Sequence, residues 1–139
     1  ATAAAIDREG WLHTGDLAVV DEVGRFRIVG RIKEMIKTGG ENVSPAEVEA
    51  VLLSSPDVSR AAVVGIPDDR WGELVTAFIV PADPSATSVD LEKLEALCRS
   101  QLSRFKIPRR WFVVDELPLT GSTKINRAEL RRRAMAASQ

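Results

Sequence analysis

Apolar residues gather in the middle of the chain in two runs, residues 59–67 and 72–81, which are rich in valine, isoleucine and alanine. The acidic turn Asp68-Asp69-Arg70 separates the two runs. Apolar runs of this length and composition, bounded by turn residues, are typical of strands. The pattern therefore predicts two consecutive strands in the middle of the chain.

A helix is predicted directly before these strands. Ser44-Pro45-Ala46-Glu47 has the composition of a helix start, because serine caps the first amides, proline suits the first helical position and glutamate closes a capping box. We expect this helix to run to about residue 53. The apolar residues on its buried side are Val48, Val51 and Leu52.

Two more helices are predicted after the strands. Apolar residues recur at helical spacing over 89–102. A last helix begins after Asn126, which acts as its cap, with Glu129 in the capping-box position and a basic outer face. Between these helices, Pro108 precedes a strand at 110–114, and a loop of small and turn-forming residues follows at 117–123.

The first part of the chain has the pattern of extended structure. Two β-prone runs, 17–20 and 25–30, are joined by a turn at 21–24 and predict a hairpin, followed by a short strand at 32–37 and a flexible stretch at 38–42. A lone hairpin is marginally stable in water, so this one needs a neighbour.

The order of elements favours an α+β fold: a small two-layer domain with a central, mostly three-stranded sheet flanked by helices. We expect the hairpin before it to belong to another domain. The predicted division is residues 1–32 as the end of a larger N-terminal domain, with the approach to a hinge, and residues 33–139 as the C-terminal domain.

Composition narrows the class of protein. The 139 residues fit one domain with an appendage, and a mean hydropathy near zero excludes both a disordered chain and a membrane span. The charges, 19 basic and 20 acidic, argue against a nucleic-acid partner. They are unevenly distributed, because residues 1–97 carry 9 basic and 17 acidic side chains and residues 98–139 carry 10 and 3. The C-terminal third therefore faces an anionic ligand, or its basic run at 131–133 is a solvated helix face.

The single cysteine, Cys98, excludes an intrachain disulfide and fits a reducing cytoplasm. Cys98 lies in an apolar helical series, which favours a buried residue over a nucleophile. The only histidine, His13, is far away in sequence. Residues 1–6 lack the positive region of a signal peptide, and we expect the sequence to start inside a longer chain.

The residue types taken one by one leave the chemistry open. There is no set of ligands spaced for a metal, no hydrolase triad and no phosphate loop. Lys124 stands in a loop of small residues, where a lysine can reach a phosphate or carboxylate or simply be solvated. Asp16, after Thr14-Gly15, can accept hydrogen bonds from sugar hydroxyls or cap a turn.

Several segments together resemble the motifs of the acyl-adenylate-forming enzymes, the AMP-binding superfamily of acyl-CoA synthetases and peptide-synthetase adenylation domains. The matching segments, in chain order, are residues 10–16, 30–49, 65–68 with 71–73, 105–108 and 118–127. The resemblance implies a ligase that joins a carboxylic acid to the α-phosphate of Mg²⁺-bound ATP and then transfers the acyl group to CoA, releasing pyrophosphate and AMP. It further implies that a small C-terminal domain rotates between the two steps.

The resemblance also assigns residues. Lys124 corresponds to the lysine of adenylate formation, Asp16 and Arg31 to residues that bind ATP or AMP, and Lys33 to the hinge. The positions that correspond to the CoA surface are Gly39, Gly40, Glu41, Trp71, Phe105 and Arg109. From the residues alone, Trp71 and Phe105 are equally readable as core aromatics. No metal ligand and no tightly bound cofactor are expected in this chain.

Two departures from the family pattern bear on the prediction. Thr123 stands before Lys124 where the family often has glycine, so we expect the loop to close differently, since threonine disfavours positive φ. Lys33 stands where the peptide-synthetase branch has aspartate, which favours an acyl- or aryl-CoA synthetase.

The leading hypothesis is the C-terminal part of an acyl-CoA synthetase that is inactive on its own, because the rest of the active site lies in the large domain. The alternatives are an adenylation domain that loads a carrier-protein pantetheine, and a detached non-catalytic module that binds CoA or a partner. The resemblance does not specify the acid, fatty or aryl, because the family's acyl pocket lies in that large domain.

Overall fold

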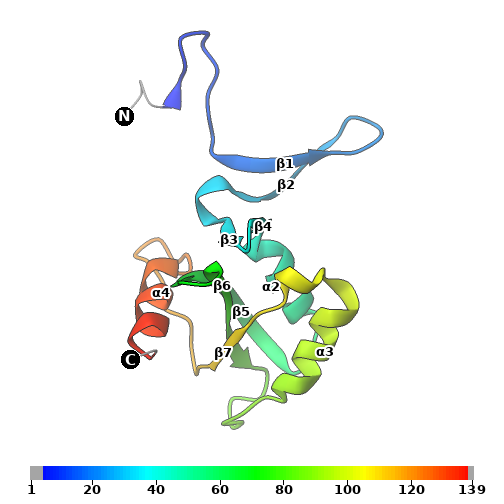
Figure 1. The fold of residues 1–139 in the computed structure, drawn as a ribbon, viewed down its shortest axis with the longest axis vertical. Coiled ribbons are helices and arrows are strands. Elements are labelled where there is room, and N and C mark those ends of the chain that lie inside the picture. The colour runs from blue at the N-terminus through cyan, green and yellow to red at the C-terminus, as the bar shows by residue number, and fades with distance from the viewer. Residues whose placement is uncertain (1–4, 138–139) are drawn as a thin grey trace.

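The computed structural model describes residues 5–137. Part of the segment 1–6, on which the expectation about the chain start rests, lies outside this range. A hairpin stands apart from a unit of sheet and helices (Figure 1). The elements, in chain order, are β1 (Asp16–Val20), β2 (Phe26–Arg31), the 3-10 turn η1 (Ile32–Glu34), β3 (Ile36–Thr38), β4 (Glu41–Val43), α2 (Pro45–Leu53), β5 (Val58–Asp68), β6 (Gly72–Pro81), α3 (Leu91–Gln101), the 3-10 turn η2 (Arg104–Lys106), β7 (Arg110–Val113) and α4 (Arg127–Ala136).

Strand β6 is the centre of a five-stranded mixed sheet. Strand β5 pairs antiparallel with it from Val58↔Pro81 to Asp68↔Gly72. Strand β7 pairs parallel with β6, and β3 pairs with β6 only at Thr38↔Gly72, with β4 beyond it. The three-stranded centre β5–β6–β7 was predicted. The short hairpin β3–β4 extends it at one corner.

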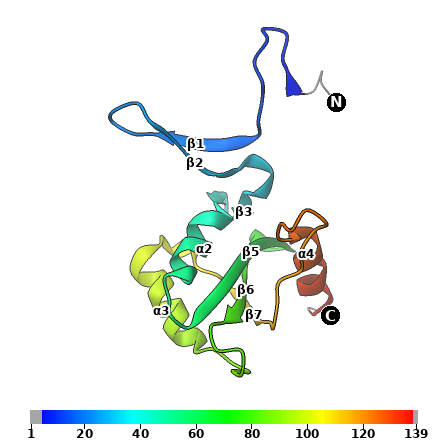
Figure 2. The same cartoon turned by 180° about the vertical axis from the view of Figure 1, so that it is seen from behind.

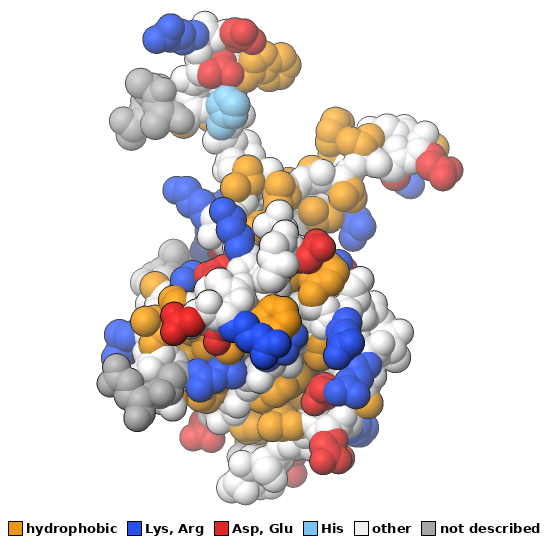
Figure 3. All heavy atoms as spheres, in the orientation of Figure 1, with side chains coloured by type: hydrophobic (Ala, Val, Ile, Leu, Met, Phe, Trp, Pro, Cys, Tyr) orange, Lys and Arg blue, Asp and Glu red, His pale blue; other side chains and the backbone are white. Residues whose placement is uncertain are grey.

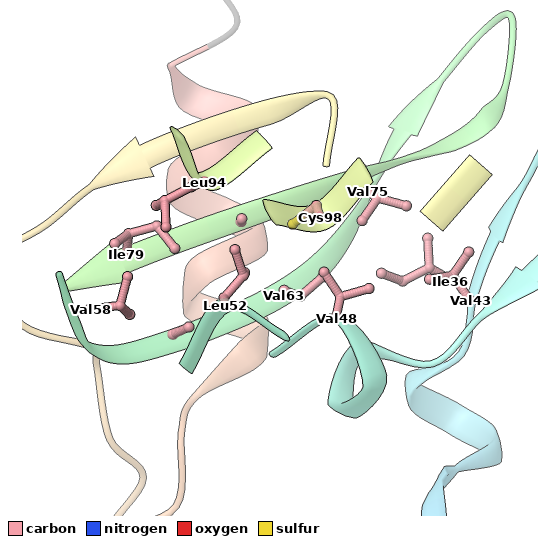
Figure 4. Packing of buried hydrophobic residues seen from close by; sticks show 12 residues of the cluster. Ile36, Val43, Val48, Leu52, Val58, Val63, Val75, Ile79, Leu94 and Cys98 are labelled. Carbon is pink, nitrogen blue, oxygen red and sulfur yellow. The ribbon is translucent and has the colours of Figure 1, made fainter. Parts of the chain in front are cut away.

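Helices cover both faces of this sheet (Figure 2). Helices α2 and α3 pack on one face, where Leu52 and Cys98 meet Val63 and Ile79 (Figure 4). Helix α4 packs on the other face, where Leu130 joins a cluster with the stacked rings of Phe78 and Phe112. Neighbouring residues of β5 and β6 point to opposite faces, and both faces are buried, which explains why these strands are continuous apolar runs. The predicted α+β domain with a flanked sheet is confirmed.

The stretch 38–42 is a tight hairpin turn rather than a flexible loop. Gly39 and Gly40 have φ of 58° and 84°, and they reverse the chain between β3 and β4. The Gly39 amide also donates to the Trp71 carbonyl at 2.8 Å. The expectation of flexibility was wrong because a partner more than thirty residues away fixes the turn.

The predicted capping box at the start of α2 is also absent. The helix does run from Pro45 to Leu53, but the Ser44 side chain accepts no hydrogen bond from its first turn. Its hydroxyl donates instead to the carbonyl of Val29 in β2, and Glu47 binds Lys106 with both carboxylate oxygens at 2.8 Å. At the start of α4 the predicted cap is confirmed, since Asn126 accepts from the Glu129 amide at 3.1 Å.

The hairpin β1–β2 exposes apolar side chains that the sheet-and-helix unit does not cover. Phe26 is 77% exposed and Ile28 is 64% exposed. Orange hydrophobic side chains stand out along this part of the molecule (Figure 3). The hairpin contacts the rest of the structure through its second strand, where Gly30 lies against the Ser44 hydroxyl. Within residues 5–137, no helix is long and apolar enough to cross a membrane.

Candidate functional site

Lys124 is carried on a short closed loop before α4. The loop is pinned at its base by a bridge between Leu119 and Ile125 and by the Thr120 amide, which donates to the Lys124 carbonyl at 2.7 Å. Lys124 itself is exposed. The loop therefore fixes the backbone of the lysine while its ammonium group reaches into solvent.

Thr123, directly before the lysine, has φ of 63°, the only positive φ outside glycine among the described residues. We expected threonine to avoid this conformation and the loop to close in another way, and that expectation was wrong. The Thr123 amide donates to the Thr120 carbonyl at 2.9 Å, and its hydroxyl donates to the Ser122 carbonyl at 2.6 Å. These local bonds hold a β-branched residue in a backbone region that usually favours glycine.

Asp16 and Arg31, both predicted to bind nucleotide, face each other across the hairpin. They are register partners of β1 and β2, and Arg31 Nε lies 3.0 Å from Asp16 Oδ1. The Asp16 amide donates to the Thr14 hydroxyl at 3.2 Å. The ion pair uses one carboxylate oxygen of Asp16, and most of the Arg31 side chain remains exposed.

Lys33, predicted as the hinge, lies in the 3-10 turn η1 between the hairpin and β3. Its side chain is exposed and makes no ion pair or hydrogen bond with any described residue. A charge that is already solvated does not oppose a change of backbone angles at this position.

Three of the residues predicted to meet CoA lie together around the Trp71 ring. Gly39 approaches so closely that a Cβ there would lie 3.1 Å from Trp71 Cε3. The Arg109 guanidinium lies over the ring, 4.1 Å from its centroid, and Arg70 lies 5.2 Å from it. Cationic groups over an indole face are attracted to its negative π cloud. Trp71 is half-buried, so this cluster forms an aromatic and cationic surface that solvent reaches.

The other predicted CoA residues are more dispersed. Gly40 and Glu41 are exposed in the β3–β4 hairpin. Phe105 is half-buried and packs against the core of α2 and α3, so the reading of this residue as a core aromatic holds for much of its side chain.

Next to Arg109 an open groove of about 680 Å³ runs between α3 and β7. Arginines and apolar side chains line it. The lining residues are Glu95, Arg99, Leu102, Arg104, Ile107, Pro108, Arg109 and Trp111. Arg104 is exposed and has no acidic partner among the described residues, so the groove presents uncompensated positive charge.

Cys98 is fully buried, as predicted. Burial, and then the charge of Glu95, raise the pKa of its thiol to about 11, which keeps it protonated and unreactive. His13 is bound to Asp7 at 2.9 Å in the N-terminal segment. Within the described part of the chain, no three His, Cys, Asp or Glu side chains gather as metal ligands would.

Sequence reasoning missed one polar cluster beside the lysine loop. Arg127 forms a partly buried ion pair with Glu49 at 2.6 Å and lies 3.5 Å from Glu34. The one signal in the sequence was Glu49 itself, a charged residue between apolar residues of the predicted helix. Its partner is 78 residues away, and spacing alone does not reveal it.

The model of the AMP-binding enzyme C-terminal domain matches residues 47–124. A feruloyl-CoA synthase of Amycolatopsis sp is 49% identical over 130 residues, which cover 94% of this chain and 26% of that protein. A 4-chlorobenzoate–CoA ligase of Arthrobacter sp is 50% identical over 132 residues, 94% of this chain and 24% of that protein.

Among solved structures, ATP-bound MatB from Rhodopseudomonas palustris superposes with a TM-score of 0.86 at 34% identity, covering 99% of this chain and 27% of that one. The chain thus spans about a quarter of the length of these relatives. The family match, the identity to the relatives and the fold all agree, and the chain belongs to the family of AMP-binding enzyme C-terminal domains.

Proposed function

We propose that this chain is the C-terminal part of an ATP-dependent acid–thiol ligase, which activates a carboxylic acid as an acyl-adenylate and transfers the acyl group to CoA. The observation that carries the proposal is the presentation of Lys124 on a closed loop. The relatives described above are named as a CoA synthase and a CoA ligase, which supports the same reaction class.

Residues 1–32 belong, in this proposal, to a large N-terminal domain, and residues 33–139 form the mobile C-terminal domain. The exposed apolar side chains of the hairpin support this division, because a hairpin with Phe26 and Ile28 in solvent lacks a core of its own. The remainder of the large domain would cover them.

In the first half-reaction a carboxylate oxygen of the acid attacks the α-phosphorus of Mg²⁺-bound ATP, and pyrophosphate leaves. Negative charge moves between the carboxylate and the phosphate oxygens, and the Lys124 ammonium group stabilises both. A preorganised donor in such a role typically contributes about 100- to 1000-fold in rate. Asp16 accepts hydrogen bonds from the ribose hydroxyls, and Arg31, held against Asp16, supports the same region.

In the second half-reaction the CoA thiol attacks the acyl carbonyl, and AMP leaves. Rotation about Lys33 brings the surface of Gly39, Gly40 and Glu41 to the site, where the glycines leave room for the thin pantetheine arm. Trp71 and Arg109 flank this arm. The arginine-lined groove beside Arg109, and the half-exposed edge of Phe105, receive the nucleotide end of CoA, whose phosphates match the positive charge.

The acid is proposed to be a fatty or aryl carboxylic acid. The two relatives named for aromatic acids favour the aryl class. A cytoplasmic location accords with the one free, buried thiol. The isolated chain is expected to be inactive, since ATP and the acid would bind mainly to the large domain.

The test is ATP–pyrophosphate exchange by the full-length protein with a panel of aromatic and fatty acids, followed by thioester formation with CoA. At least one acid should support both steps. Lys124→Ala should lower the exchange about 100-fold or more while sparing thioester formation from supplied acyl-adenylate. The matched control is Lys93→Ala, a lysine on α3 paired with Asp57. If no acid supports exchange, the proposal that the full-length protein is an acid–thiol ligase is wrong. If the acyl group is transferred to a carrier-protein pantetheine and not to CoA, the acceptor in the proposal is the carrier protein instead of CoA.

A further inference from the structure

Arg127, the first residue of α4, binds elements that are far apart in the sequence. Its Nη1 and Nη2 atoms lie 2.6 and 3.2 Å from the two carboxylate oxygens of Glu49 in α2. Nη1 also donates to the carbonyl of Val63 in β5 at 2.9 Å, and the Val63 amide donates to Glu49 at 2.8 Å. The Arg127 side chain is 22% exposed and that of Glu49 is 13% exposed. A planar guanidinium in such a fork fixes direction as well as distance.

The third nitrogen of the same guanidinium lies near the 3-10 turn η1. Arg127 Nε lies 3.5 Å from Glu34 Oε2. Burial alone would lower the pKa of Arg127, but the hydrogen bonds that it donates to Glu49, and the negative charges of Glu49 and Glu34, raise this pKa overall. The cation is therefore permanent, and it holds two carboxylates at once.

Arg127 also fixes the base of the lysine loop. It stands three residues after Lys124, and Asn126 between them donates its amide to the Pro118 carbonyl at 2.8 Å. With Arg127 tied to α2 and β5, the C-terminal end of the loop is held to the middle of the sheet-and-helix unit. When the sheet moves, the backbone of Lys124 therefore moves with it.

The residues on the other side of Lys33 are anchored independently. Arg31 is paired with Asp16 at 3.0 Å, and the Ile32 amide donates to the Gly15 carbonyl at 2.9 Å. Two hydrogen bonds join residues on either side of Lys33: a long one from the Met35 amide to the Ile32 carbonyl at 3.4 Å, and one from the Ser44 hydroxyl to the Val29 carbonyl at 2.9 Å, which a rotation about Lys33 would break. Lys33 thus stands between a segment tied to the hairpin and Glu34, which is tied to Arg127.

We propose that Arg127 is a positioning residue that couples the hinge to the lysine. Through Glu34 it fixes the chain just after Lys33, and through Glu49 and Val63 it fixes the base of the Lys124 loop. Rotation is thereby confined to Lys33, and the lysine moves as one rigid body with the turn. This inference rests on the proposed function, because that function supplies the rotation.

If Arg127 only stabilised the fold, its contacts with Glu49 and Val63 would suffice. The variant Glu34→Ala removes only the contact that couples Arg127 to the hinge, and it therefore distinguishes the two roles. Glu34 is 41% exposed, and its removal leaves the buried pair intact. In the full-length protein we expect trypsin to cleave after Lys33 about two- to fivefold faster, once the rate is divided by that for the same bond in the unfolded variant, which corresponds to the loss of a partly exposed ion pair. The kcat of pyrophosphate exchange should fall by a similar factor, while the KM for ATP and the melting temperature stay close to those of the parent protein. Glu92→Ala, an exposed carboxylate on α3, is the matched control.

The second variant, Arg127→Lys, keeps a cation near Glu49 and loses the fork. The effects of Glu34→Ala and Arg127→Lys on cleavage after Lys33 should be non-additive, because both remove the same contact. Additive effects, or a Glu34→Ala protein with unchanged cleavage and unchanged kcat, would overturn the proposal. If the full-length protein activates no acid, the proposed function fails, but the cleavage rates still test whether Arg127 fixes the chain after Lys33 through Glu34.

Discussion

The Ser44 hydroxyl donates to the carbonyl oxygen of Val29 at 2.9 Å, and it thereby ties the start of α2 to the hairpin strand β2. Ser44 stands at the cap position of α2 but leaves the first amides of the helix uncapped. Gly30 lies close to this contact, because a Cβ on Gly30 would lie 3.0 Å from the Ser44 hydroxyl oxygen. The side chain thus serves the junction between the hairpin and the sheet rather than its own helix.

Replacing Ser44 with alanine should therefore loosen the junction without fraying α2. We expect faster amide exchange in β2 and unchanged exchange at Glu47 and Val48. Asn126→Ala is the comparison, since Asn126 does cap α4, and its loss should cost about 1 kcal/mol and speed exchange at Glu129. Exchange measured by mass spectrometry on both variants checks the contrast. Equal fraying of both helices would contradict it.

A glycine at position 123 should stabilise the chain. Thr123 has φ of 63°, and a left-handed backbone costs an L-residue roughly 1–2 kcal/mol. Glycine avoids this cost, but it loses more conformational entropy on folding, which cancels about half of the gain. Thr123→Gly should raise the free energy of unfolding by about 0.5–1 kcal/mol in urea titrations. Thr123→Val, which keeps the β-branch and loses the hydroxyl bond to Ser122, should be less stable than the parent. A destabilised glycine variant would show that the hydroxyl bond outweighs the backbone strain.

Much of the fold follows from local sequence. The strand at Gly72–Pro81 was predicted with its observed bounds, and the helix was predicted to end at about Leu53, where it does end, because apolar runs and a proline start are local signals. The turn at Gly39-Gly40 and the role of Ser44 were not, because each depends on a distant partner, Trp71 or Val29. Local sequence specifies which residues bend or cap, and the tertiary structure decides which partner they take.

The candidate site shows the same division. The motifs led to Asp16 and Arg31, which the hairpin register does bring together, and to Gly39, Trp71 and Arg109, which form one cluster. Their roles in binding stay predictions. The pair of Glu49 and Arg127 was missed because an ion pair between two helices leaves no periodic signal.

Alanine at position 39 should be worse tolerated than alanine at position 40. Both glycines have positive φ, so each variant pays for backbone strain of about 1 kcal/mol. Only at Gly39 would the new methyl group meet the Trp71 ring, at 3.1 Å, whereas the space around Gly40 is open. Gly39→Ala should therefore unfold at a lower urea concentration than Gly40→Ala, and in the full-length protein it should raise the KM for CoA more. Equal KM values for the two variants would argue against a role of the Trp71 surface in CoA binding.

The stability of α4 should depend on pH through Glu129. Hydrogen bonds from Arg132 and then Arg133 lower the pKa of this carboxyl from its ordinary 4.5 to about 2. A carboxyl whose pKa is lower in the folded state stabilises that state above its unfolded pKa, and the contribution is lost as pH falls through the folded pKa. The melting temperature of the parent protein should therefore exceed that of Glu129→Gln at pH 6, and the gap should close between pH 4.5 and about 2. Because these charges are exposed, 1 M salt should narrow the gap at pH 6 as well. A gap that stays constant across this range would show that Glu129 acts through packing rather than through its charge.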